Sequence, residues 1–91
     1  MNGRALLAWN LRRLRAERGI SQEQLAADAQ ADRAYISELE RQQGNASVDM
    51  MDRLAAVIGI PLAEFFRVPE KGAKKAKPLP SGRRPARPKR V

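Results

Sequence analysis

The sequence predicts an all-α domain of five short helices, residues 1–68, followed by a disordered basic tail, residues 69–91. Three observations support this prediction. Apolar residues of the first part recur every three or four positions, as they do on one face of a helix. No stretch carries a strand signal. From Pro69 onward the apolar period ends, and five of the six prolines and nine basic residues give a composition that buries too little surface to fold.

The first two predicted helices are separated by a glycine. Residues 4–18 form the first helix, because leucines recur on one stripe at spacings of four and three: Leu7, Leu11 and Leu14. Gly19 follows as a helix stop. Ser21 then offers its hydroxyl oxygen to the second helix, and Gln24 three residues later completes a capping-box pattern. The inward positions of this helix are Leu25, Ala26 and Ala29.

The helical pattern of residues 21–40 is interrupted, although the stretch contains neither Gly nor Pro. It stops at Gln30 and restarts at Asp32, a favourable N-cap for a third helix with Ile36 and Leu39 on its apolar stripe. Two short helices joined by a tight turn are the arrangement of a helix-turn-helix DNA reader. Its second helix stands off the body and enters a groove about 12 Å wide. The other interpretation is any small helical bundle with a short loop.

Two further helices complete the predicted domain. Ser47 caps the fourth helix, whose apolar positions keep the helical spacing: Val48, Met51, Leu54, Ala55 and Ile58. Gly59 ends this helix, and Pro61 opens a short fifth helix with the sequence LAEFF. A core of Leu and Ile from five helices is just large enough for a domain of about 65 residues to fold alone.

The residue types that the chain lacks restrict its function. It has no cysteine and no histidine, which removes disulfides, thiolate metal sites and the commonest general base and metal ligand. We therefore expect neither an enzyme nor a bound metal or cofactor. No run approaches the roughly 20 apolar residues of a membrane span, and there is no signal-peptide core. A cytoplasmic, nucleoid-associated location without membrane contact is expected.

The formal net charge of +8 is confined to the tail. Residues 1–68 hold nine arginines and nine acidic residues, which balance. Residues 69–91 hold nine basic residues against a single acid, Glu70. The tail is therefore expected either to bind phosphates as a cationic arm or to serve only as a solubilising extension.

Three stretches of the predicted domain resemble one family of DNA-binding proteins. They are LRAERGISQEQLA at 14–26, DRAYISELER at 32–41 and SVDMMDRLAAVIGIPLAEFF at 47–66. Together they look like the Cro/cI, or Xre-like, class of helix-turn-helix domains, and they most closely resemble the controller proteins of restriction–modification systems. The resemblance covers residues 4–66. It implies a five-helix lambda-repressor-like fold, double-stranded DNA as a partner and action as a homodimer.

The resemblance also implies which residues touch DNA. Gln22, at the start of the second helix, would contact a phosphate. The third helix would read bases in the major groove through Arg33, which would pair with guanine because a guanidinium fork matches the two acceptors of that base. The other base-reading candidates are Ala34, Ser37 and Glu38. Tyr35 would lie against the sugar–phosphate backbone. The loop that follows would track this backbone with Arg41, Gln43 and Asn45.

Other positions match the family or depart from it. Arg15 and Glu40 match an ion pair that ties the first helix to the end of the third. Gln30 stands where Gly is usual, so a non-Gly residue is expected in the left-handed region at a cost of roughly 1–2 kcal/mol. Ala34 replaces the common Thr or Ser and can make only an apolar contact, for instance with a thymine methyl. Gly44 stands where another Arg is common.

Apolar residues near the end of the domain exceed what one core stripe needs: Met50, Val57, Ile60, Leu62 and Phe66. A second apolar face predicts a partner. The resemblance makes this partner a second copy of the chain, with Ile60, Leu62 and Phe66 at the interface and Phe65 in the core. Trp9 lies off the leucine stripe of the first helix and is expected either to be partly exposed or to pack on the fifth helix.

From the sequence we predict a homodimeric, sequence-specific regulator of transcription on a pseudo-palindromic operator. The two third helices would lie about one helical turn, roughly 34 Å, apart. Occupying a promoter would block or recruit RNA polymerase, which is a candidate partner. One alternative keeps the fold but acts mainly through protein contacts, as an antitoxin or adaptor. RNA binding through the tail is less supported, because the four aromatic residues are not interleaved with the basic run. Binding to a membrane surface is also less supported, because the basic tail lacks the apolar face that such binding needs.

Overall fold

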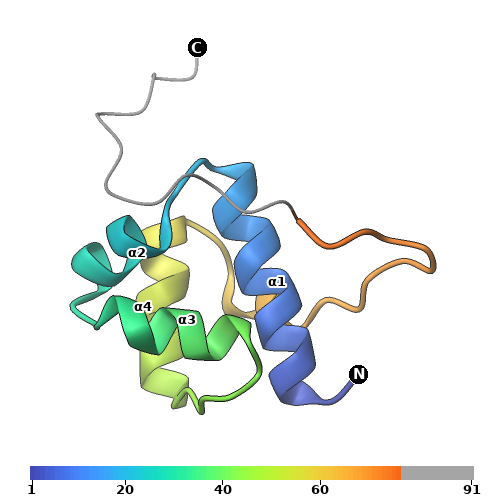
Figure 1. Cartoon of the computed structure of the whole chain (residues 1–91), viewed down its shortest axis with the longest axis horizontal. Coiled ribbons are helices and arrows are strands. Elements are labelled where there is room, and N and C mark those ends of the chain that lie inside the picture. The colour runs from blue at the N-terminus through green and yellow to red at the C-terminus, as the bar shows by residue number, and fades with distance from the viewer. Residues whose placement is uncertain (77–91) are drawn as a thin grey trace.

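The computed structural model describes residues 1–76, which form four α-helices and one 3₁₀ helix joined by short loops. In chain order the elements are α1 (Gly3–Glu17), α2 (Gln22–Ala29), α3 (Arg33–Glu40), α4 (Val48–Ile58) and η1 (Leu62–Phe66) (Figure 1). The predicted all-α class is confirmed, with a 3₁₀ helix in place of the fifth α-helix. Most of the tail that we predict to be disordered, residues 77–91, lies outside the described residues. Within residues 1–76, no helix is both long enough and apolar enough to span a membrane.

Side-chain caps define where the helices begin. The Ser21 hydroxyl oxygen accepts a hydrogen bond from the Gln24 backbone N–H at 3.0 Å, and the Ser47 hydroxyl does the same for the Met50 N–H at 3.0 Å. Both bonds satisfy N–H groups that have no partner inside the helix. Asp32 stands at the predicted N-cap position of α3, but its side chain makes no capping hydrogen bond.

The break between α2 and α3 is a left-handed turn at Gln30, with φ 58° and ψ 47°. The Ala31 N–H donates to the Ala26 carbonyl at 2.8 Å, and the Gln30 N–H donates to the Ala27 carbonyl at 3.3 Å, which is the Schellman pattern. The Arg53 guanidinium from α4 donates to the carbonyls of Ala29 and Gln30. These bonds hold a glutamine in a conformation that usually needs glycine, as the sequence predicts.

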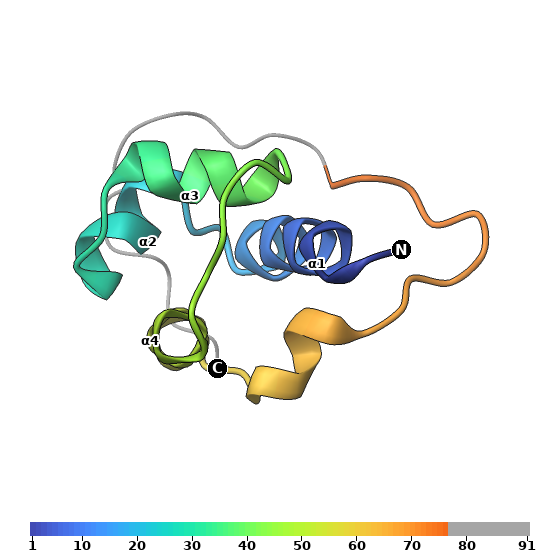
Figure 2. The ribbon, with the colours of Figure 1, turned by 90° about the horizontal axis from the view of Figure 1, so that it is seen from below.

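The core lies between α1 and the two layers that flank it. In Figure 2, α1 runs between α3 on one side and α4 with η1 on the other. The least exposed apolar side chains come from all five elements: Leu11, Leu25, Ile36, Leu39, Leu54 and Phe65. Phe65 is fully buried and Phe66 is 39% exposed, as predicted.

Val48 contradicts the expectation that it joins the apolar stripe of the fourth helix, because it is 61% exposed. It is the first residue of α4, and side chains of a helix lean toward the N-terminus. The Val48 side chain therefore extends past the end of the core. The buried positions of α4 are Leu54, Ala55 and Ile58.

Asn10 is a buried polar residue that fastens the end of η1 to α1. Its side chain is almost completely inaccessible, and its amide nitrogen donates to the carbonyls of Leu6 (3.0 Å), Phe65 (2.9 Å) and Arg67 (2.8 Å). A buried amide is costly unless its hydrogen bonds are made, so Asn10 fixes where the chain runs after η1. We did not predict this role, although Asn10 lies three residues after Leu7 and four before Leu14, on the buried stripe.

Candidate nucleic-acid interface

Helix α3 has one buried face and one face open to solvent. Ile36, Leu39 and Glu40 are buried against α1 and α2. The predicted base-reading residues Arg33, Ala34 and Glu38 are exposed, and Ser37 is half-buried. A helix that packs through a single narrow stripe leaves the rest of its surface available to a ligand. The structure thus places these predicted residues together on one short helix.

Arg33 stands at the first position of α3, and its side chain is 56% exposed. Its Nε lies 3.6 Å from Oε1 of Glu23 in the first turn of α2. Ion pairs at such exposed positions contribute about 0–1 kcal/mol, so DNA can compete for this guanidinium. The pair links the start of α3 to the first turn of α2.

A buried ion pair supports the end of α3. Nε and Nη2 of Arg15 donate to the two carboxylate oxygens of Glu40 at 2.7 and 2.8 Å, and Arg15 Nη1 donates to the Ile20 carbonyl at 2.9 Å. Both side chains are nearly inaccessible to solvent. This is the pairing that the resemblance implies. It fixes the C-terminal end of α3 relative to α1.

Gln22 is tied to the same carboxylate. Its amide nitrogen donates to Oε1 of Glu40 at 3.1 Å. An amide nitrogen carries two protons, so one remains for the phosphate that the resemblance assigns to Gln22. Arg12, which sequence reasoning did not single out, approaches the same oxygen with its Nε at 3.6 Å.

The loop after α3 is held by two side chains from outside it. The Tyr35 hydroxyl donates to the Asn45 carbonyl at 2.7 Å. Arg4, at the start of α1, donates to the Asn45 side-chain oxygen from Nε at 3.0 Å and from Nη2 at 2.5 Å. Burial raises the pKa of the Tyr35 hydroxyl above its ordinary value, and the charge of Glu38 raises it further. Arg4 was missed by the sequence analysis because no local spacing connects it with residue 45.

At the start of the loop, Arg41, Gln42 and Gln43 are exposed. Arg41 donates to the Ser37 hydroxyl and, from its Nε, to the Gln43 side-chain oxygen at 3.4 Å. Gln42 is a second non-Gly residue at positive φ, 63°, which the sequence analysis did not identify. A Cβ on Gly44 would lie 3.3 Å from a methyl carbon of Leu39, so a larger residue there would require a small shift of the Leu39 side chain.

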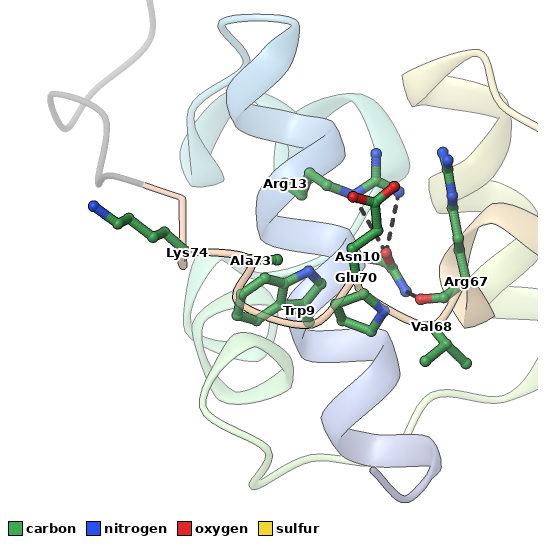
Figure 3. A pocket seen from close by; sticks show the side chains of 9 residues that line it. Trp9, Asn10, Arg13, Arg67, Val68, Glu70, Ala73 and Lys74 are labelled. Atoms are coloured by element: carbon green, nitrogen blue, oxygen red, sulfur yellow. Dashed lines mark hydrogen bonds between the residues drawn. The ribbon is translucent and has the colours of Figure 1, made fainter.

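The predicted dimer-interface residues remain accessible to different degrees. Ile60 and Leu62 are partly buried against the core, as are Met50 and Val57. Phe66 is exposed. Trp9 is half-buried, and the cavity beside it is lined by residues that follow η1 rather than by η1 itself (Figure 3). Within residues 1–76, no group of acidic side chains could hold a metal ion.

Comparison with known proteins identifies the family. Residues 11–65 match the helix-turn-helix family. A Neisseria meningitidis protein named Neisseria hypothetical transcription factor is 35% identical over 71 residues, which cover 78% of this chain and 67% of that protein. The crystal structure of the hypothetical transcription factor NHTF from Neisseria matches with a TM-score of 0.72 and 34% identity, covering 77% of this chain and 80% of that one.

Controller proteins of restriction–modification systems are also similar, as the sequence predicts. The control protein C.MunI from Mycoplasma is 39% identical over 62 residues, which cover 67% of this chain and 84% of that protein. The crystal structure of the controller protein C.AhdI from Aeromonas hydrophila matches with a TM-score of 0.67 and 36% identity, covering 69% of this chain and 96% of that one. The chain belongs to the helix-turn-helix family of DNA-binding transcriptional regulators.

Proposed function

We propose that this protein regulates transcription by binding a pseudo-palindromic DNA operator as a homodimer, without enzymatic activity. One observation carries the proposal: α3 exposes a row of side chains of mixed polarity, headed by Arg33, while its other face is fixed by the buried Arg15–Glu40 pair. A helix that enters the major groove needs this combination of an exposed reading face and a rigid mount. Binding to chromosomal DNA would make the protein cytoplasmic and nucleoid-associated.

The proposed DNA contacts are of two kinds, to base edges and to backbone phosphates. Arg33 would donate two hydrogen bonds to O6 and N7 of a guanine, leaving Glu23 as it does so. Ala34 would contact a thymine methyl, and Ser37 and Glu38 would face base edges. Contacts to phosphate fix the register of a protein on the duplex but carry no sequence information. Gln22 and the loop would make them, the loop residues being Tyr35, Arg41, Gln43 and Asn45.

The surface at η1 supports the proposed homodimer. Phe66 is exposed, and Ile60 and Leu62 are only partly buried, so this surface gains free energy when a second copy covers it. A two-fold axis would give each half of an inverted repeat one copy of α3. A promoter so occupied would be closed to RNA polymerase or would attract it. Two similar proteins named as controller proteins support a regulatory role.

The sharpest test compares Arg33→Ala with Arg67→Ala. Arg67 is also an exposed arginine with a weak pair, 3.8 Å from Glu64, but it lies after η1. Arg33→Ala should lose about 1–3 kcal/mol of discrimination at one base pair per half-site, measured as affinity for the preferred operator against single-base variants. Arg67→Ala should keep the discrimination. Equal losses on operator and random duplex after Arg33→Ala would limit Arg33 to phosphate contact.

A further inference from the structure

The chain that follows η1 crosses α1 to the side that carries α3. In Figure 2, the segment after η1 passes around α1 and reaches the level of α3. Asn10 fixes the start of this path by donating to the Arg67 carbonyl at 2.8 Å. We call residues 67–76 the crossing segment. Its route brings the beginning of the basic tail close to the candidate DNA-binding surface.

Trp9 is the point over which the crossing segment bends. Figure 3 shows its indole inside this bend, next to Ala73. Trp9 lines two cavities of about 230 Å³ each, one shared with Val68 and Ala73 and the other shared with Lys75. The Trp9 ring offers the crossing segment a large apolar surface to pack on, at a small cost in conformational entropy.

A turn within the crossing segment directs the lysines that follow it. The Ala73 N–H donates to the Glu70 carbonyl at 2.9 Å, and Gly72 between them has φ 87°. Positive φ at the third residue is characteristic of a type II turn, which favours Gly there. After this turn, Lys74 lines the first cavity and Lys75 the second.

Lys75 lies near Glu40, whose negative charge is already paired with arginines. Its cavity also has Arg12, Glu40 and Gln42 in its lining, so it lies at the C-terminal end of α3. The Glu40 carboxylate is bound by Arg15 at 2.7 Å and approached by Arg12 at 3.6 Å. Lys75 is therefore not needed to neutralise Glu40, and it adds positive charge beside the loop that starts at Arg41.

We infer that the crossing segment is a DNA-contacting element whose Lys75 binds backbone phosphates of the duplex that α3 reads. This inference rests on the proposed function and adds a second binding surface to it. The partner is the sugar–phosphate backbone, because Lys75 offers an ammonium group beside a loop expected to track that backbone. Residues 1–68 have no net charge, whereas six more basic residues follow Ala76 in the sequence. Counterion release by the basic residues after position 68 supplies DNA affinity that residues 1–68, with no net charge, lack.

A matched pair of lysine variants tests the DNA contact. Lys75→Gln should make the slope of log affinity against log salt shallower by about 0.9 per protomer, on operator and random duplex alike. Lys71→Gln, on the exposed outer position of the turn, should leave the slope unchanged. If Lys75→Gln leaves the slope unchanged but lowers the melting temperature, Lys75 only stabilises the negative end of α3 and the inference is wrong.

A second pair of variants tests the path without changing any charge. Gly72→Val places a β-branched residue at positive φ, whereas Gly72→Asn keeps a residue that tolerates it. A Cβ at Gly72 meets nothing within 4 Å, so backbone strain alone separates the two variants. Trp9 is the only tryptophan, and its fluorescence reports on the bend. In Gly72→Val, its emission should shift to the red, acrylamide should quench it more strongly, and the salt slope should become shallower.

The outcomes separate this inference from the proposed function. Gly72→Val with exposed Trp9 and an unchanged salt slope would show that the path exists but does not serve DNA binding, which would overturn the inference. Unchanged Trp9 fluorescence in Gly72→Val would overturn the inference as well, because it would show that the crossing segment does not cover the indole. A protein that shows no preference for any operator would refute the proposed function. The slopes on random duplex would still decide whether Lys75 meets phosphate.

Discussion

The polar surface of α3 and the apolar surface at η1 are both accessible, but the physical cost of that exposure differs. Arg33 and Glu38 on α3 are charged and well hydrated, so they lose nothing by facing water. Phe66 on η1 is apolar and 39% exposed, and each Å² of such surface left in water costs about 25 cal/mol. The first surface therefore suits a polar ligand that comes and goes, and the second suits a stable apolar partner.

The two surfaces also differ in what supports them. Behind α3 lies a buried charge network, in which Glu40 receives two hydrogen bonds from Arg15 and one from Gln22. Behind η1 lie the fully buried Phe65 ring and the amide of Asn10. Removing one partner of the buried network should therefore lower the free energy of unfolding far more than removing one partner of a surface ion pair.

Glu40→Ala should destabilise the domain by about 3–5 kcal/mol, because it leaves the Arg15 guanidinium buried without its counter-charge. Glu17→Ala is the control, since Glu17 is half-exposed and its 3.4 Å pair with Arg13 should contribute no more than about 1 kcal/mol. Urea unfolding followed by circular dichroism measures both. A loss below about 1 kcal/mol in Glu40→Ala would show that the network does not support α3.

Phe66→Glu should yield a monomer, because a charge buried at an apolar interface costs at least about 2 kcal/mol of association free energy. Val48→Glu is the matched control, since Val48 is also exposed and apolar but lies at the start of α4. Light scattering at micromolar concentration should find dimer mass in wild type and Val48→Glu. Dimer mass in Phe66→Glu would refute the assigned interface.

Tyr35→Phe should weaken DNA binding by about 0.5–1.5 kcal/mol, because the loop loses the hydrogen bond from the hydroxyl to the Asn45 carbonyl. The raised pKa adds a second test. The stability that this hydroxyl contributes is present below its unfolded-state pKa and is lost as the pH rises through the folded-state pKa. Wild type should therefore lose more stability than Tyr35→Phe above pH about 10. Parallel pH curves would contradict the assignment.

Gln30→Gly should stabilise the domain slightly, by up to about 1 kcal/mol, because Gln30 has φ 58° and glycine adopts this conformation without strain. The gain is reduced by the extra freedom of glycine in the unfolded chain. Gln42→Gly, at φ 63°, should behave similarly. Thermal melting monitors both variants. A lower melting temperature for Gln30→Gly would mean that the glutamine side chain stabilises the domain by more than the backbone strain costs.

Local signals in the sequence predict much of the fold. Caps such as Ser21 and Ser47 act on N–H groups three residues away, and apolar stripes repeat within one helix, so a single segment contains the information. The left-handed turn at Gln30 and the Arg15–Glu40 pair were predicted from resemblance to a known family. That resemblance also supplied the candidate DNA contacts.

Features that depend on distant segments were not predicted. The Arg4 bond to Asn45 joins residues 41 positions apart, and the Asn10 bond to the Arg67 carbonyl joins residues 57 positions apart. No periodicity connects such pairs, because the packing of the helices sets their distance. The place of Trp9 under the crossing segment has the same origin. Val48 shows the opposite failure, since a correct apolar period does not reveal that a helix extends past its core.

The central claim is that two copies of α3 read the two halves of one operator. Selection of bound sequences from a random pool of duplex DNA by the full chain tests it most directly. We expect the enriched duplexes to contain inverted half-sites whose centres lie about 10 base pairs apart, one helical turn of DNA. The same selection with Arg33→Ala should lose one guanine from each half-site and keep the spacing. Enrichment of a single half-site, or no enrichment at all, would contradict the account.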